Sequence, residues 1–228
     1  RDYIVPSRVH KGKFYALPQA PQQYKQLLMT AGFDKYYQIA PCFRDEDARA
    51  DRSPGEFYQL DFEMSFATQE DVFKVGEEVL AETFKTFAPE GSAVTEAPFP
   101  VISYKQAMLE FGTDKPDLRN PLRIIDVTEF FQRCTFKPFH KKTVRAIRVH
   151  GDLSKGFHEK LLKFAQEIGM SGLGYLEVLE DLSYKGPIDK FIPEEMKKEL
   201  AEIAGLSAGD TIFFIAAAEK LACKYAGQ

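Results

Sequence analysis

Apolar and polar residues alternate most regularly between Phe57 and Phe66, and this alternation predicts a β-strand. Every even position is apolar, and every odd position after Phe57 is polar. A period of two residues places the two classes on opposite faces of a strand. The apolar positions are Tyr58, Leu60, Phe62, Met64 and Phe66, and the polar positions are Gln59, Asp61, Glu63 and Ser65. We expect the apolar face to meet a core and the polar face to form the floor of a cleft.

A second extended, aromatic-rich run from Tyr36 to Arg44 predicts the partner strand of a hairpin, which we place at about residues 35–66. The connection over residues 45–56 is long for a hairpin, and long connections are often functional. Ahead of the hairpin, residues 18–32 predict a turn followed by a helix, since Pro21 suits a first helical turn and Gly32 a helix end. Gln22 and Lys25 then share a helix face, because they stand three residues apart.

Further elements follow the hairpin. Hydrophobic periodicity predicts a helix from about Glu70 to Phe87, and Thr68 with Asp71 has the spacing of a capping box. After Asn120, strand-like and helix-like runs alternate, which indicates a separate α+β unit. The strand-like runs are Val144–Val149, Gly174–Leu179 and Thr211–Ala216, and the helix-like runs are Phe157–Ile168, Glu194–Ile203 and Ala218–Tyr225. We therefore divide the chain into residues 1–119 and 120–228.

Composition excludes several classes of protein. With 44% hydrophobic residues, 20 Phe and 10 Tyr, the 228-residue chain has too much apolar surface to remain unfolded. No run of about 18 apolar residues predicts a membrane helix. The net charge of −4 gives no overall basic field, so a nucleic acid would need a local patch. Three scattered cysteines suggest a reducing, cytoplasmic compartment and offer no metal site, and Cys42 is expected to pack inside the hairpin.

Several polar groups around the predicted hairpin suit the recognition of a small zwitterion. The planar guanidinium of Arg44 can grip a carboxylate or a phosphate. Lys25 and Gln22 supply an ammonium and an amide, and Asp61 supplies a carboxylate for a substrate ammonium. Together these groups fit an α-amino acid with an acidic side chain. A charge-mixed, solvated hairpin surface is the alternative interpretation.

Three stretches around the hairpin carry a family resemblance: Phe43–Asp47, Arg49–Arg52 and Glu56–Glu63. They resemble motif 2 of the class II aminoacyl-tRNA synthetases, in the version found in bacterial aspartyl enzymes. The segments Arg1–Val9, Ala16–Gln22 and Asp114–Asn120 are similar to the same family and follow in the same order. The resemblance implies part of an antiparallel-sheet catalytic domain, followed from residue 120 by an α+β insertion domain.

The resemblance also implies roles for individual residues. Arg44 is the implied catalytic residue, binding the α-phosphate of ATP and the substrate carboxylate. The implied aspartate-binding residues are Gln22, Lys25, Arg44, Gln59 and Asp61. The implied ATP-binding residues are Arg44, Asp45, Glu46, Ser53 and Phe57, with Phe57 stacking on adenine. The implied contacts to the tRNA acceptor end are Arg49, Arg52 and Glu56. Gly55 looks like an extra residue relative to the commonest pattern of the family.

The implied activity is ligation of L-aspartate to tRNA through an aspartyl-adenylate, with ATP as substrate and Mg²⁺ as cofactor, in a cytoplasmic homodimer without membrane contact. The Mg²⁺ ligands, motif 3 and the anticodon-binding domain of the family are not recognisable in this stretch, so we expect the chain alone to be inactive. Two alternatives stay open: an asparagine-related paralogue, and a non-enzymatic insert module that binds tRNA or a protein.

Overall fold

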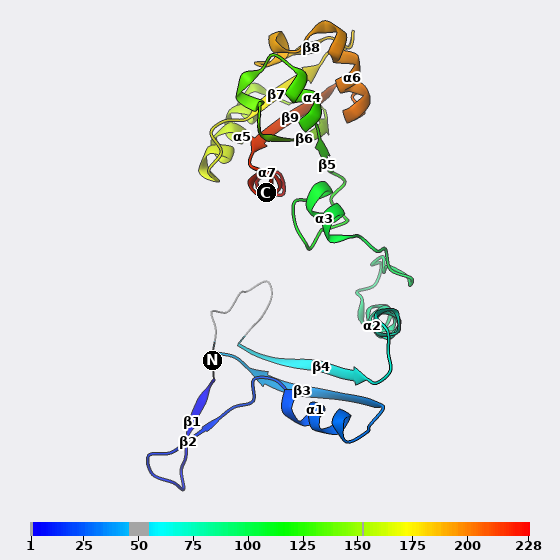
Figure 1. Ribbon diagram of the computed structural model, residues 1–228, viewed down its shortest axis with the longest axis vertical. Coiled ribbons are helices and arrows are strands. Elements are labelled where there is room, and N and C mark those ends of the chain that lie inside the picture. Colours follow the sequence, from blue (N-terminus) through cyan, green and yellow to red (C-terminus); the bar gives the residue numbers. More distant parts are fainter. Residues whose placement is uncertain (1, 46–54, 152) are drawn as a thin grey trace. The chain divides into compact units, whose positions relative to one another are not determined.

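The computed structural model describes residues 2–45, 55–151 and 153–228 (Figure 1). Contacts within the chain separate two compact units, Arg1–Pro100 and Val101–Gln228, which are treated one at a time. The boundary predicted between residues 119 and 120 separates a partial catalytic domain from an insertion domain. The contacts do not test that assignment, so it stays a prediction. In the structure, residues after Val101 pack with the second unit, because α3 (Tyr104–Glu110) contacts β5 (Ile124–Asp126).

The first unit consists of two antiparallel hairpins and two helices. Its elements are β1 (Ile4–Pro6), β2 (Phe14–Ala16), α1 (Gln22–Thr30), β3 (Lys35–Phe43), β4 (Glu56–Met64) and α2 (Gln69–Phe87). Strand β1 pairs with β2, and β3 pairs with β4. The predicted helix before the hairpin, the hairpin itself and the helix after it are all confirmed, whereas the short β1–β2 hairpin was not predicted.

The capping box of α2 is present as predicted. The Thr68 hydroxyl accepts a hydrogen bond from the Asp71 amide at 3.3 Å, and the Asp71 carboxylate accepts one from the Thr68 amide at 2.8 Å. These two bonds satisfy backbone donors that the first helical turn leaves unpaired. The Thr68 amide, followed by the Thr68 hydroxyl, which donates to Asp71 Oδ2 at 2.8 Å, holds the pKa of Asp71 below its usual range.

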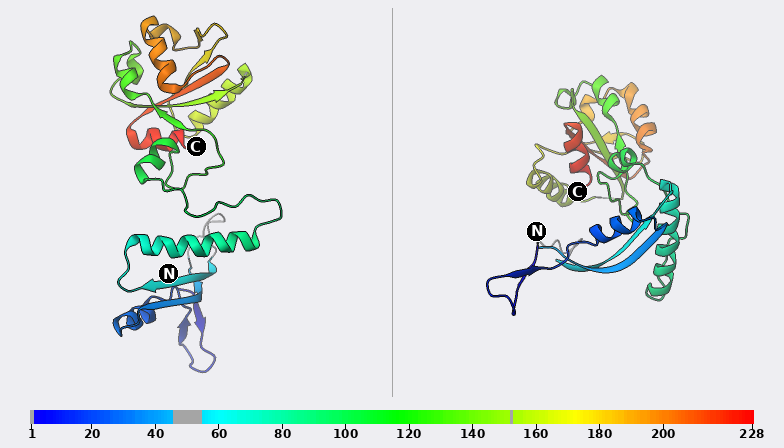
Figure 2. Two further views of the ribbon diagram at one scale, coloured as in Figure 1. Left: turned by 90° about the vertical axis from the view of Figure 1, so that its right-hand side faces the viewer. Right: turned by 60° about the horizontal axis from the view of Figure 1, so that its bottom comes forward.

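The register of the β3–β4 hairpin decides which side chains share a face. Opposite each other lie Ala40 and Gln59, and two residues further along, Gln38 and Asp61. Helix α1 lies along this hairpin, as the right-hand view of Figure 2 shows. Because Lys25 of α1 reaches the face that carries Asp61, this helix covers the polar face.

The expectation that the apolar face of β4 meets a core is wrong for the described unit. Tyr58 is 73% exposed and Leu60 is 50% exposed, whereas Asp61 on the opposite face is only 5% exposed. A sheet of two strands is too narrow to close a core by itself. The polar face becomes the covered one because ion pairs tie α1 to it.

The second unit is built on a five-stranded antiparallel sheet with the order β5-β6-β9-β7-β8. Its strands after β5 are β6 (Thr143–His150), β7 (Gly174–Val178), β8 (Tyr184–Lys185) and β9 (Asp210–Ala217). Its helices after α3 are α4 (Thr128–Arg133), α5 (Lys155–Glu167), α6 (Glu194–Ala204) and α7 (Glu219–Ala226), with 3₁₀ turns at Lys137–Phe139 and Asp189–Phe191.

Aromatic and aliphatic side chains fill the core of the second unit. Phe131 on α4 packs edge-to-face on Phe214 of β9, with 5.0 Å between the ring centroids, and both are almost fully buried. Aromatic pairs in this geometry stabilise a core beyond the area that they bury. The six strand-like and helix-like runs predicted after residue 120 are all confirmed, whereas α4, β5 and β8 were not predicted.

Candidate functional site

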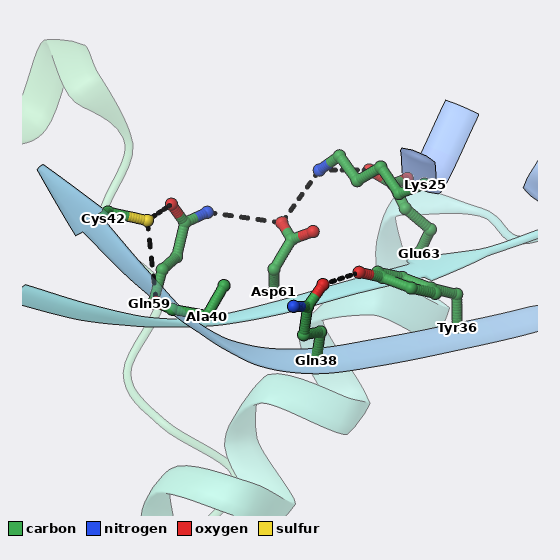
Figure 3. Close-up of polar contacts among 8 residues, drawn as sticks. All are labelled: Lys25, Tyr36, Gln38, Ala40, Cys42, Gln59, Asp61 and Glu63. Carbon is green, nitrogen blue, oxygen red and sulfur yellow. Dashed lines mark hydrogen bonds and ion pairs between the residues drawn. The ribbon is translucent and has the colours of Figure 1, made fainter. Parts of the chain in front are cut away.

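A buried ammonium lies at the centre of the polar face of the hairpin. Lys25 is the one buried residue of α1, at 7% exposure. Its Nζ lies 2.8 Å from Asp61 Oδ1 and 2.7 Å from Glu63 Oε1 (Figure 3). The hydrogen bond to Asp61, followed by that to Glu63, raises the pKa of Lys25 above its usual value. The side chain is therefore a fixed positive charge at neutral pH.

Asp61 has one oxygen engaged and one oxygen free to accept. Its Oδ1 accepts hydrogen bonds from Lys25 and, at 3.3 Å, from the Gln59 side-chain amide. Its Oδ2 is buried and has no hydrogen-bond partner among the described residues. A buried carboxylate oxygen without a partner is costly, so this atom is the natural place for a donor from a bound molecule.

Further polar contacts line the same face on both sides of Asp61. The buried Cys42 thiol lies 3.8 Å from Gln59 Oε1 and 3.6 Å from the carbonyl of Ala40. Cys42 is fully buried, so its predicted packing role is confirmed. Further along β3, the Tyr36 hydroxyl donates to Gln38 Oε1 at 2.5 Å. The face thus carries a continuous row of polar groups.

A second group of side chains gathers where β3 ends. The Arg44 amide donates to the Gly55 carbonyl at 2.7 Å, and its Nε donates to the Gln19 carbonyl at 3.4 Å. The guanidinium carbon lies 5.1 Å from the centroid of the Phe57 ring, within the range of a cation–π interaction. An aromatic ring next to a fixed positive charge is suited to binding a nucleotide, whose base can stack on the ring and whose phosphate can pair with the cation.

The structure brings together most of the predicted site residues that it describes. Lys25, Gln59 and Asp61 form one hydrogen-bonded cluster, and Arg44 and Phe57 form another. Gln22 is exposed and has no hydrogen bond to either cluster, so its predicted share in the site is not seen. Asp45 and Glu56 are exposed at the strand ends. The remaining predicted residues, Glu46, Arg49, Arg52 and Ser53, lie outside the described residues.

Glu63 was placed on the polar face by the sequence but was given no role in the site. The two-residue period of β4 places Glu63 on the face of Gln59 and Asp61. Its side chain is 41% exposed, against 6% for that of Asp61. Of the two carboxylates on Lys25, Glu63 is therefore the one that water and solutes reach.

Two further observations bound the chemistry of the described residues. Among residues 2–45, 55–151 and 153–228, no group of three or more His, Cys, Asp or Glu side chains could hold a metal ion. Within the same ranges, no helix is long and apolar enough to cross a membrane. A largely apolar cavity of about 470 Å³ lies within the second unit and contains none of the predicted site residues.

Comparison with known proteins gives close matches over the whole chain. A protein of Anaplasma phagocytophilum (strain HZ) named aspartate--tRNA(Asp/Asn) ligase is 53% identical over 235 residues. A protein of the same name from Methylorubrum populi is 57% identical over 240 residues. Both alignments cover 100% of this chain and 39% of the relative, so the chain spans about two fifths of the length of these proteins.

A solved structure gives a weaker match. The crystal structure of asparaginyl-tRNA synthetase from Pyrococcus horikoshii complexed with asparaginyl-adenylate aligns with 99% of this chain and 56% of that chain. The sequence identity is 19% and the TM-score is 0.38.

The family model described as tRNA synthetases class II (D, K and N) matches residues 1–204. This match agrees with the motif resemblance in the hairpin and with the mixed α+β architecture built on antiparallel sheets. The chain belongs to the class II tRNA synthetases of the D, K and N type, and it corresponds to part of the catalytic region of bacterial aspartate--tRNA(Asp/Asn) ligases.

Proposed function

We propose that the protein carrying this chain activates L-aspartate with ATP as aspartyl-adenylate and then transfers the aspartyl group to tRNA. The observation that carries this proposal is the Lys25–Asp61 cluster: a buried ammonium beside a buried carboxylate with one unpartnered oxygen. The names of the relatives, aspartate--tRNA(Asp/Asn) ligase, support the same substrate.

Charge complementarity assigns each end of aspartate to a group on the polar face. The substrate ammonium donates to Asp61 Oδ2, the buried oxygen that has no partner among the residues the structure describes. The side-chain carboxylate pairs with Lys25, where it joins or displaces the more exposed Glu63. Asparagine brings a neutral amide to the same place, and it forfeits the charge-assisted bond that makes such contacts about twice as strong as neutral ones.

Adenylate formation needs positioned charge, not a side-chain nucleophile. An α-carboxylate oxygen of aspartate attacks the α-phosphorus of ATP, the bond from that phosphorus to the bridging oxygen breaks, and pyrophosphate leaves with the electron pair. Arg44 stabilises the negative charge on the phosphoryl oxygens, and Phe57 stacks on adenine. In the second step, a ribose hydroxyl at the tRNA end attacks the acyl carbon, loses its proton and displaces AMP.

The finer assignments belong to the same proposal. Asp45, Glu46 and Ser53 contact ATP, and Arg49, Arg52 and Glu56 contact the acceptor end of tRNA. Mg²⁺ accompanies ATP, and because the described residues contain no fitting ligand group, no step is assigned to it. Residues 120–228 form an insertion domain after the partial catalytic domain of residues 1–119. The full-length protein is a cytoplasmic homodimer.

Aspartate-dependent exchange of pyrophosphate into ATP tests the proposal in the full-length protein. We expect exchange with L-aspartate and little with L-asparagine. Lys25→Met should lower kcat/KM for aspartate by about 100-fold, since losing one partner of a buried charged contact costs about 2–5 kcal/mol. Lys163→Met is the control, because Lys163 is exposed on α5.

Two results would contradict the proposal. A wild-type preference for asparagine would favour an asparagine-related paralogue. Absence of exchange with either amino acid, together with tRNA binding, would favour a non-enzymatic module.

A further inference from the structure

A backbone hydrogen bond across the hairpin joins Arg44 to Gly55. Phe43 and Glu56 are the last registered pair of β3 and β4. One step beyond that pair, the Arg44 amide donates to the Gly55 carbonyl at 2.7 Å. The position of the Gly55 peptide therefore sets where the Arg44 backbone lies.

A side chain on Gly55 would meet the hydroxyl of Tyr3. A Cβ atom built on it would lie 2.6 Å from the Tyr3 hydroxyl oxygen and 3.2 Å from the Arg44 carbonyl oxygen. Its φ angle lies outside the left-handed region, so another residue could adopt this backbone conformation. A side chain on Gly55 would therefore displace the hydroxyl of Tyr3, a residue that is 38% exposed, from its place beside this peptide.

Tyr3 is hydrogen-bonded to residues 17–19, the segment that also contacts Phe43 and Arg44. The Tyr3 carbonyl accepts a hydrogen bond from the Leu17 amide at 2.9 Å. The Pro18 carbonyl then accepts from Phe43 at 2.9 Å, and the Gln19 carbonyl accepts from Arg44 Nε at 3.4 Å. One continuous stretch, residues 17–19, thus links the Tyr3 backbone to the Arg44 side chain.

We propose that Tyr3 is a positioning residue for Arg44, acting through Gly55. The Tyr3 ring lies against Gly55 and keeps its carbonyl on the Arg44 amide, so that the guanidinium stays beside Phe57. This inference rests on the proposed function, in which Arg44 stabilises the reacting phosphoryl group. Misplacing a catalytic group by about 1 Å can lower the rate about 100-fold. Tyr3 can therefore affect catalysis although it does not touch the substrate.

The distances around Gly55 define a rescue experiment in the full-length protein, read by aspartate-dependent pyrophosphate exchange. Gly55→Ala should lower kcat by about 10- to 100-fold. KM for aspartate should change less than kcat, because Lys25 and Asp61, which bind the other two charged groups of aspartate, are not displaced. Adding Tyr3→Phe to Gly55→Ala should restore most of kcat, since removing the hydroxyl leaves Tyr3 Cζ at 3.5 Å as that residue's nearest atom.

Two further variants control the experiment. Gly76→Ala in α2 is the matched control, because a Cβ on Gly76 meets nothing within 4 Å, and its exchange rate should match wild type. Tyr3→Leu removes the ring, and it should again lower kcat more than it changes KM for aspartate. Tyr3→Phe alone is the reference for the double variant.

The outcomes separate this inference from the proposed function. A wild-type protein without aspartate-dependent exchange overturns the proposed function and the positioning role together. With exchange present in the wild type, unchanged kcat in Gly55→Ala or Tyr3→Leu overturns the positioning role alone. A double variant no faster than Gly55→Ala also overturns it, because the clash with the hydroxyl would then not be the cause.

Discussion

Removing the Lys25 ammonium should destabilise the polar face of the hairpin, and the structure sets the size of the effect. The ammonium contacts two carboxylates at 2.7 and 2.8 Å. At an effective dielectric constant of about 20, each contact corresponds to roughly 6 kcal/mol of attraction. Dehydration of the buried ammonium and of Asp61 offsets most of this gain.

The loss of local stability expected for Lys25→Met lies between two limits. Breaking a fully buried ion pair costs about 3–5 kcal/mol, and breaking a surface pair costs about 0–1 kcal/mol. Asp61 is buried, but the Glu63 side chain is 41% exposed and can be rehydrated. We therefore expect a loss of about 2–3 kcal/mol in local stability, which arises mainly from the carboxylate of Asp61 left buried without its partner.

Hydrogen exchange followed by mass spectrometry measures this loss on the peptides that cover α1 and the β3–β4 hairpin. Their protection factors should fall by about 30- to 150-fold in Lys25→Met, at about 1.4 kcal/mol for each tenfold change. Lys163→Met should leave them unchanged, and Lys25→Met/Asp61→Asn should recover most of the protection. Equal protection in Lys25→Met and wild type would refute the view that this ion pair holds α1 to the hairpin.

Three further predictions concern pH, thiol reactivity and packing. The pKa of Lys25 lies above its usual value of 10.5, so its contribution should be complete below pH 10.5 and lost as pH rises through the folded-state pKa. The melting-temperature difference between wild type and Lys25→Met should then shrink only above pH 10.5, and a difference that vanishes near pH 8 would contradict this. Burial raises the pKa of the Cys134 thiol to about 11, so iodoacetamide at pH 8 should modify Cys134 only after unfolding, as mass spectrometry would report. Gly112→Ala should destabilise the second unit by about 1–3 kcal/mol in urea, because Gly112 has φ of 69° and a Cβ there would overlap the Cys223 carbonyl. The control Gly172→Ala, which meets nothing within 4 Å, should have little effect, and equal midpoints for the two variants would refute the packing argument.

Local sequence signals predicted the elements that build the site. The alternation along Phe57–Phe66 identified β4 and the side chains that share its polar face. The pair Thr68 and Asp71 located the start of α2, because a capping box involves only neighbouring residues. The alternation and the capping box each depend on residues within one strand or one helical turn. They can therefore be recognised without knowledge of the tertiary structure.

Sequence reasoning grouped Lys25 with Asp61, but it missed other features that depend on contacts between distant segments. The alternation in β4 separates two faces, but it does not say which face is covered, and the apolar side chains Tyr58 and Leu60 are exposed. The i, i+3 spacing put Gln22 and Lys25 on one side of α1, yet only Lys25 reaches Asp61. The second carboxylate on Lys25, that of Glu63, follows from the docking of α1 on the hairpin.

Calorimetric titration of the full-length protein with a non-hydrolysable aspartyl-adenylate analogue tests the central claim most directly. The claim is that Lys25 binds the side-chain carboxylate of aspartate and that Asp61 binds its ammonium group. We predict that wild type binds the aspartyl analogue about 100-fold more tightly than the asparaginyl analogue, and that Lys25→Met loses most of this preference. Equal affinity of wild type and Lys25→Met for the aspartyl analogue would contradict the account.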